Sequence, residues 1–295
     1  MEQTQNATTQ AADALVYSDL ADLADRYDFF LVDCDGVLWI GEKAVDHSFA
    51  ALDYLIQERN KKVFFITNAT QRSRQTLMDK KLKQTYGFDK VPYTQLYTSA
   101  YMASQYLKRL VTEEGSMRKI DNPAVYVVGE VGLREELTEI GVRIINPEDY
   151  DDPAVSMSEE EAEAYAIDPS VVAVVCGINF TMSYRKVAIA TMYVNENKAK
   201  LIGSNPDRNS GNEHRVIPAG GSCIKVIESA TGVNAVFVGK PETHMFNLVR
   251  EEHGITDTTK ALMIGDNIAT DIKFGSNSGI DTLLVLTGCT GPKKA

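Results

Sequence analysis

The sequence predicts an α/β fold in which a doubly wound parallel sheet is interrupted by a second α/β unit. Continuous apolar runs of the kind found in buried parallel strands alternate with helix-like segments along the chain. A polar segment at residues 113–122 breaks this alternation, which then starts again. Polar side chains also follow four of the predicted strands, at the edge where open α/β sheets bind ligands.

The first part of the chain predicts the order strand, helix, strand, helix. Residues 1–12 are polar and are expected to be disordered. Residues 28–34 form an apolar run that predicts a buried strand, and a helix is expected after it. Residues 62–67 predict the second strand, and residues 72–86 the next helix. This order favours parallel pairing of the strands.

A second series of strands and helices fills the middle of the chain. Its elements are expected at residues 98–111, 124–128, 131–140, 171–176, 184–193 and 201–202. Residues 148–168 are acidic and irregular, and their carboxylates lack the spacing of a calcium-binding loop. We expect this stretch to be an exposed loop or a short solvated helix.

The last third of the chain returns to the first pattern. Its elements are expected at residues 222–231, 235–238, 243–252, 260–264, 268–274 and 281–286. We therefore expect a core domain built from both ends of the chain, residues 1–99 and 208–295. An α/β domain at residues 100–207 is expected to be inserted into it.

Composition limits the possible partners and compartments. The net charge of -11 repels nucleic acid and anionic membranes, so neither is an expected partner. A phosphate site would need local positive charge from a metal, a lysine or backbone N–H groups. No apolar run is long enough to span a membrane, and the N-terminus lacks a signal-peptide core. With four cysteines expected as reduced thiols, these features predict a cytoplasmic location.

Two acidic residues leave the end of the first predicted strand. Asp33 and Asp35 are two residues apart, so at strand spacing their side chains point the same way. Two carboxylates so near each other repel, which costs free energy unless a cation is present or one of them is protonated. The pair suggests a metal-assisted site with a nucleophile and a general acid. Taken alone, the segment is explained better as a turn in which Gly36 supplies a positive φ.

Two further strand ends carry groups that suit phosphate. Thr67 and Asn68 could bind phosphate oxygens, or they could cap the following helix. Lys240 follows the strand predicted at residues 235–238, where it could be a fixed positive charge or an ordinary surface lysine.

The fourth strand end is acidic. Asp266 follows residues 260–264, with Asn267 beside it and Asp271 in the next helix. Such oxygen donors suit a hard cation such as Mg²⁺, although an acid at a helix start also stabilises the helix dipole. The occurrence of all four groups at strand ends favours one shared active site.

The segments DCDGVLW, ITNAT, VGKP and GDNIATD resemble the four motifs of the haloacid dehalogenase superfamily of aspartate-nucleophile phosphatases. The resemblance extends to the family of 4-nitrophenyl phosphatase, phosphoglycolate phosphatase and pyridoxal phosphatase, through stretches such as GINFTMSYRKVAIA, IGSNPDRN and IPAGGSCIKVIESATG. It spans about residues 28–288. It implies a Rossmann-like core with a large α/β cap between the second and third motifs, and relatives that often dimerise through the cap.

The resemblance also implies roles in the hydrolysis of small phosphorylated metabolites. Asp33 would attack phosphorus, and Asp35 would protonate the leaving oxygen and then activate water. Thr67 and Asn68 would hold phosphate oxygens. Lys240 would neutralise charge on the nucleophile and the phosphoryl group.

A Mg²⁺ ion is part of the same implied mechanism. It would be bound by Asp33, by Asp266 and by the backbone carbonyl of Asp35. Asp271 would orient the water shell of the metal or Lys240, and Asn267 would lie in the same outer layer.

Several residues near the implied substrate position stay open. Gly36, Asn205 and Asp207 are expected to face the substrate, the last two because they lie where the cap returns to the core. Trp39 follows the nucleophile motif, where the family has a flap beside the active site; a packing role is equally compatible.

The sequence departs from the family pattern at two positions that could alter the choice of substrate. The second motif reads TNAT where many relatives have TNNS, and Asn179 stands where relatives often have Asp. A phosphotransferase or mutase using the same aspartyl phosphate is an alternative function. A non-catalytic phosphate-binding protein is another.

Overall fold

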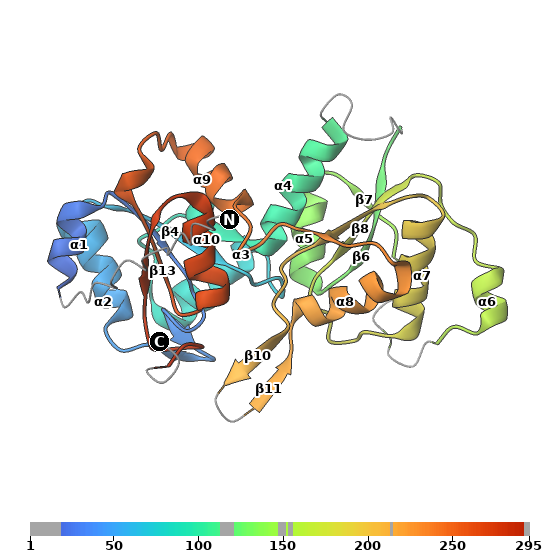
Figure 1. Ribbon diagram of the computed structural model, residues 1–295, viewed down its shortest axis with the longest axis horizontal. Coiled ribbons are helices and arrows are strands. Elements are labelled where there is room, and N and C mark those ends of the chain that lie inside the picture. Colours follow the sequence, from blue (N-terminus) through green and yellow to red (C-terminus); the bar gives the residue numbers. More distant parts are fainter. Residues whose placement is uncertain (1–18, 113–120, 147–151, 153–155, 213–214, 292–295) are drawn as a thin grey trace, which may run out of the picture.

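The computed structural model describes residues 19–112, 121–146, 152, 156–212 and 215–291. They form two lobes, and each lobe is built on a five-stranded parallel sheet (Figure 1). The predicted α/β class is confirmed. The disorder predicted for residues 1–12 lies outside the described residues.

The first sheet combines the two ends of the chain. Its strand order is β14-β13-β1-β4-β5. The bounds are Phe29–Val32 for β1, Lys62–Thr67 for β4, Leu96–Thr98 for β5, Ala261–Gly265 for β13 and Asp281–Leu284 for β14. Val32 at the end of β1 pairs with Ile264 on one side and Phe65 on the other. This register brings the residues that follow β1, β4 and β13 to one edge of the sheet.

Helices cover both faces of the first sheet (Figure 1). They are α1 Leu20–Arg26, α2 Ser48–Asp53 with π-helical η1 Tyr54–Glu58, α3 Arg74–Thr76 with π-helical η2 Leu77–Thr85, α9 His244–His253, and π-helical η5 Ile268–Ile272 with α10 Lys273–Ser278. Short 3₁₀ turns lie at η3 Tyr93–Gln95 and η4 Thr258–Lys260. Leu31 of β1 enters the core on one face, and Phe30 and Val32 enter the core on the other. This alternation explains the continuous apolar run.

The second sheet has the order β12-β9-β8-β6-β7. Its strands are β6 Ala124–Val128, β7 Arg143–Ile144, β8 Val171–Cys176, β9 Lys200–Gly203 and β12 Val236–Phe237. Its lobe contains the helices α4 Ser99–Thr112, α5 Val131–Glu139, α7 Tyr184–Asn195 and α8 Gly220–Thr231 (Figure 1). Every side chain of β6 and β8 is buried, as their runs of apolar residues predict.

The strand pairing differs from the expectation at β12. Residues 235–238 were expected as a strand of the core domain, but Val236 and Phe237 pair with Ile202 and Gly203 of β9. Gly203 makes this pairing possible, since a Cβ there would lie 2.8 Å from the ring of Phe237. The chain therefore returns to the first lobe only after β12.

Two hairpins were not expected from the sequence. β2 Trp39–Ile40 pairs with β3 Lys43–Ala44 directly after the nucleophile motif. β10 Asn209–Asn212 pairs with β11 Arg215–Pro218 and projects below the two lobes in Figure 1.

The acidic stretch contains a short solvated helix, as one of its two expected forms. This helix, α6 Glu159–Glu163, has no buried residue and starts with a capping box between Ser158 and Glu161. Residues 148–151 and 153–155 of the same stretch lie outside the described residues. Within the part of the chain that is described, no helix has both the length and the apolar character needed to cross a membrane.

The two lobes contact each other between α3 and α5. The backbone N–H of Arg74 donates to Oε1 of Glu136 at 2.6 Å, and Nε of the same arginine lies 3.6 Å from Oε2. Gly132 allows this approach, because a Cβ there would lie 2.2 Å from the backbone of Arg72. A buried ion pair and a close backbone contact thus join the lobes beside the second motif.

Candidate active site

Lys240 is a buried cation between two carboxylates. Its Nζ lies 2.6 Å from Oδ1 of Asp33 and 2.6 Å from Oδ1 of Asp271, and it donates to the backbone oxygen of Ile66 at 2.9 Å. Two of the ammonium N–H groups are therefore hydrogen-bonded, to Asp33 and to Ile66, and Asp271 adds a close ion pair. Burial lowers the pKa of Lys240, but Asp271 and Asp33 outweigh this and raise it above its ordinary value. The lysine therefore stays charged.

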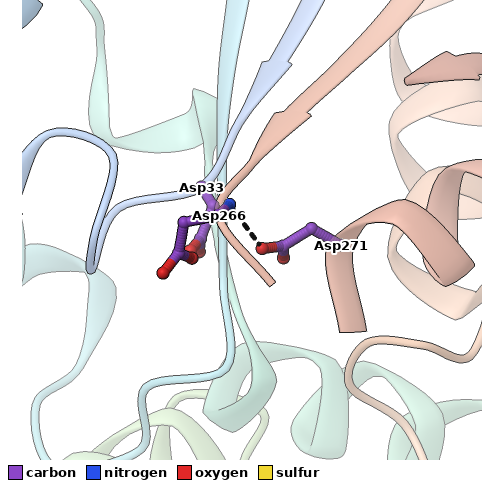
Figure 2. A group of neighbouring side chains, drawn as sticks. All are labelled: Asp33, Asp266 and Asp271. Carbon is purple, nitrogen blue, oxygen red and sulfur yellow. Dashed lines mark hydrogen bonds between the residues drawn. The ribbon is translucent and has the colours of Figure 1, made fainter. Parts of the chain in front are cut away.

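Three carboxylates surround this cation. Oxygen atoms of Asp33, Asp266 and Asp271 lie within 4.8 Å of one another. Figure 2 shows Asp33 and Asp266 at the ends of neighbouring strands, while Asp271 reaches in from the following helical segment. Burial and the charge of Asp271 raise the pKa of Asp33, although Lys240 opposes the effect. One lysine can balance only one of the three carboxylates, and this donor set fits a hard divalent cation.

Asp271 is held by the strand end that precedes it. Its Oδ2 accepts the backbone N–H of Asp266 at 3.1 Å (Figure 2) and that of Asn267 at 3.1 Å. Its Oδ1 faces Lys240. The side chain of Asn267 caps the helical turn by accepting from the N–H of Ala269 at 2.9 Å. Asp271 is thus in ion-pair contact with the lysine, and the two roles expected for it stay predictions.

Two glycines pack their main chain against the carboxylate of Asp266. Gly36 has φ +88°, and a Cβ there would lie 2.3 Å from Oδ2 of Asp266. Gly288 also approaches Asp266, and a Cβ there would lie 1.9 Å from the same oxygen. The N–H of Cys289 donates to that oxygen as well. Glycine is required at both positions because the main chain packs directly against this carboxylate and leaves no room for a side chain. The substrate contact expected for Gly36 stays a prediction.

The amide of Asn68 is fully engaged within the protein. Its Oδ1 accepts the backbone N–H of Lys240 at 2.9 Å, and its Nδ2 donates to the backbone oxygen of Lys240 at 3.0 Å. The second N–H of Nδ2 donates to Oδ2 of Asp207 at 3.0 Å. Both donors of the amide are used. Phosphate binding by this side chain, as the sequence predicted, would require one of these bonds to break.

Asn205 and Asp207 join this network from the segment after β9. Asn205 is buried, and its Nδ2 donates to the backbone oxygen of Asn68 at 2.9 Å. Its Oδ1 accepts the N–H of Asp207 at 3.1 Å. Burial raises the pKa of Asp207, although the bond from Asn68 opposes this. Both residues thus lie beside the second motif, and the substrate contact expected for them stays a prediction.

Thr67 and Asp35 differ in their surroundings. Thr67 is buried at the end of β4, and its hydroxyl accepts the N–H of Ala69 at 3.2 Å. Asp35 is exposed and accepts a hydrogen bond from the indole of Trp39. Asp35 therefore lies outside the carboxylate group around Lys240.

Two family models match the segments that build this site. The model described as haloacid dehalogenase-like hydrolase matches residues 30–143, and a HAD-hydrolase-like model matches residues 237–295. Phosphoglycolate phosphatase 2 of Arabidopsis thaliana is 35% identical over 283 residues, which cover 95% of this chain and 89% of that protein. The chain belongs to the haloacid dehalogenase-like hydrolases, and among them to the phosphatases. The predicted family is confirmed.

Other relatives agree with this membership. The 4-nitrophenylphosphatase of Schizosaccharomyces pombe is 31% identical over 267 residues, covering 90% of this chain and 85% of that protein. The solved structure of a double mutant thermostable NPPase from Geobacillus stearothermophilus has a TM-score of 0.71 and 27% identity, and the match covers 91% of this chain and 92% of that one.

Sequence reasoning missed part of the site of this hydrolase. The segment after β14 contributes Gly288 and Cys289 to the grip on Asp266, and Thr287 donates its hydroxyl to the backbone oxygen of Gly36. None of the four motifs includes these residues. A glycine following the last predicted strand was the only signal in the sequence.

Proposed function

We propose that this phosphatase hydrolyses small phosphate monoesters with the help of Mg²⁺, through an aspartyl phosphate on Asp33. The observation that carries the proposal is Lys240, held between Asp33 and Asp271 beside the carboxylate of Asp266. Phosphoryl transfer depends mainly on in-line positioning and on neutralising the phosphoryl oxygens. A buried lysine among carboxylates supplies fixed positive charge to an otherwise acidic protein.

The covalent step forms a bond between a carboxylate oxygen of Asp33 and phosphorus. The bond from phosphorus to the ester oxygen breaks, and the leaving oxygen takes a proton from Asp35. Water then loses a proton to Asp35 and attacks phosphorus. Inorganic phosphate leaves, and the carboxylate of Asp33 is restored.

The donor set of the site supports a role for Mg²⁺. Asp33 and Asp266, with the backbone carbonyl of Asp35, would hold the ion. Asp271 would act outside the direct ligands, because its two oxygens face Lys240 and two backbone N–H groups. Bound Mg²⁺ would supply positive charge next to the phosphoryl oxygens. Thr67 would hold one of these oxygens through its hydroxyl.

The bonds of Asn68 support a positioning role for this residue. Its amide holds both backbone polar groups of Lys240, so it sets where the lysine side chain starts. The bond from the same amide to Asp207 links this position to the segment that leaves β9.

We further propose that the second lobe is a cap that limits the size of the substrate. The membership of β12 in its sheet supports a cap from about residue 100 to about residue 238, in place of the expected end at residue 207. Assembly of two copies through this cap stays a prediction. All four cysteines are free, which supports a reducing compartment such as the cytoplasm.

The names of the relatives support small substrates of more than one kind. One relative is named for phosphoglycolate and another for 4-nitrophenyl phosphate, at similar identity to this chain. Asn179, which could alter substrate choice, accepts a hydrogen bond from the buried Lys186 at 3.0 Å in the second lobe. A phosphotransferase is the weaker candidate, because mutases of the superfamily usually carry their cap between the first two motifs.

The first experiment measures phosphate release from phosphoglycolate, pyridoxal phosphate, glycerol phosphate and 4-nitrophenyl phosphate, with Mg²⁺ and with a chelator. We expect release that stops on chelation and returns when Mg²⁺ is added back. Release that ignores the chelator would contradict the metal role. No release from any ester would favour a phosphotransferase or a binding protein.

A further inference from the structure

The indole ring of Trp39 is buried and packed against an aromatic ring and a lysine. It is 1% exposed and stacks on Tyr86, with ring centroids 5.5 Å apart and planes at 14°. The ammonium of Lys81 lies 4.8 Å from the centroid and donates to the backbone oxygen of Gly41 at 2.8 Å. Stacking, burial and the cation contact together fix the orientation of the ring.

The N–H of this fixed ring points at Asp35. Nε1 donates to Oδ1 of the carboxylate at 2.8 Å. Asp35 is exposed, and among the described residues the indole is the one side chain that bonds it. An exposed aspartate without such a bond samples several rotamers. The bond to Oδ1 selects one of them and leaves Oδ2 for other partners.

Trp39 also closes the loop that carries Asp35. Its backbone oxygen accepts the N–H of Gly36 at 2.7 Å, and its backbone N–H donates to the oxygen of Cys34 at 3.2 Å. The backbone on both sides of Asp35 is therefore tied to the same residue that holds its side chain.

We propose that Trp39 is a positioning residue that aims the carboxyl group of Asp35 for proton transfer. The inference rests on the proposed function, in which Asp35 gives a proton to the leaving oxygen. With Oδ1 bound by the indole, Oδ2 carries the transferred proton. The carboxyl group then loses little rotational freedom on reaching the transition state, which raises the rate.

The test compares leaving groups that need a proton with one that does not. An alkoxide is a poor leaving group, whereas 4-nitrophenolate departs without protonation. Trp39→Phe keeps an aromatic ring against Tyr86 and lacks the N–H. We expect kcat/KM to fall about 10- to 100-fold for glycerol phosphate and about threefold or less for 4-nitrophenyl phosphate. The value of kcat/KM reports on the formation of the aspartyl phosphate, which is the step in which Asp35 acts as an acid.

Two matched variants separate positioning from packing. In an Asp35→Ala background, Trp39→Phe should have almost no further effect, since its target is gone. Tyr86→Leu removes a stacking partner that fixes the ring but keeps the N–H, so it should cause a smaller loss than Trp39→Phe, again mainly on glycerol phosphate. An equal loss on both esters for Trp39→Phe, or a loss that persists without Asp35, would overturn the proposal.

The protein has a single tryptophan, which allows a closer substitution. Global replacement of tryptophan by β-(3-benzothienyl)alanine puts sulfur in place of the N–H with almost no change of shape. It should cause the same selective loss on glycerol phosphate, even if Trp39→Phe does not fold. If the wild type is active but the substituted protein shows no selective loss, only the role of Trp39 is refuted. A wild type inactive on every ester would refute the proposed function together with it.

Discussion

Asn68 and Lys240 are joined by two hydrogen bonds that run in opposite directions. The backbone N–H of Lys240 donates to Oδ1 of Asn68 at 2.9 Å, and Nδ2 of Asn68 donates to the backbone oxygen of Lys240 at 3.0 Å. The two residues are 172 positions apart in the sequence. The residue that follows β4 of the first sheet therefore fixes the backbone position from which Lys240 reaches the site.

Removing this amide should lower turnover more than substrate affinity. Asn68→Ala frees the backbone of Lys240, and a misplaced cation should reduce kcat about 10- to 100-fold with KM nearly unchanged. Steady-state kinetics on 4-nitrophenyl phosphate measures both values. Asp207→Asn is the matched control, because its amide oxygen can still accept from Asn68. A raised KM with an unchanged kcat would instead support the phosphate contact predicted from the sequence.

Asp33→Asn should abolish turnover and weaken the response to Mg²⁺. Burial and Asp271 raise the pKa of Asp33, so the charged carboxylate is disfavoured until a cation compensates it. We expect turnover to fall at least about 1,000-fold and the Mg²⁺-induced rise in Tm to shrink. Thermal unfolding with Mg²⁺ and with chelator measures the second effect. Asp53→Asn on the exposed side of α2 is the control, and equal responses in both variants would argue against Asp33 as a ligand.

Gly288→Ala should raise the Mg²⁺ concentration needed for half-maximal activity. A Cβ at this position would lie 1.9 Å from Oδ2 of Asp266, so the carboxylate must move. Changes next to metal ligands typically weaken metal affinity about 10- to 100-fold. Gly291→Ala is the matched control, because nothing lies within 4 Å of its added Cβ. Identical Mg²⁺ titrations for the two variants would contradict the grip on Asp266.

Glu136→Gln should change how stability depends on pH. Burial raises the pKa of Glu136, although bonds from Arg74 oppose this, so the folded protein holds the proton more tightly than the unfolded chain. The stability that this proton contributes is complete below the ordinary pKa of a glutamate. It is lost as the pH rises through the folded-state pKa.

Urea unfolding between about pH 4 and about pH 7 tests this prediction. The free energy of unfolding of the wild type minus that of Glu136→Gln should fall as the pH rises. Gln keeps an oxygen that can accept from the N–H of Arg74. Glu139→Gln, on the exposed side of the same helix, is the control. A difference that rises with pH would show that the ion pair with Arg74 outweighs burial.

The sequence alone predicted the class of fold, the family and the convergence of four polar segments. Lys62–Thr67, Ala124–Val128 and Val171–Cys176 are strands with the predicted bounds, because long apolar runs are local signals. Asp33 and Asp266 meet because adjacent parallel strands end at the same edge of a sheet. Neither result depends on details of side-chain packing.

The tertiary structure decided which segments work together within that frame. The membership of β12, the pairing of Asn68 with Lys240 and the approach of Gly288 to Asp266 join segments far apart in the sequence. The hairpin of Trp39 is local but has strands of only two residues, too short for a periodic pattern. The bond from Trp39 to Asp35 depends on a ring that is fixed by Tyr86 and Lys81, which belong to the helical segment after β4. Such contacts arise only when separate elements pack, so no local pattern predicts them.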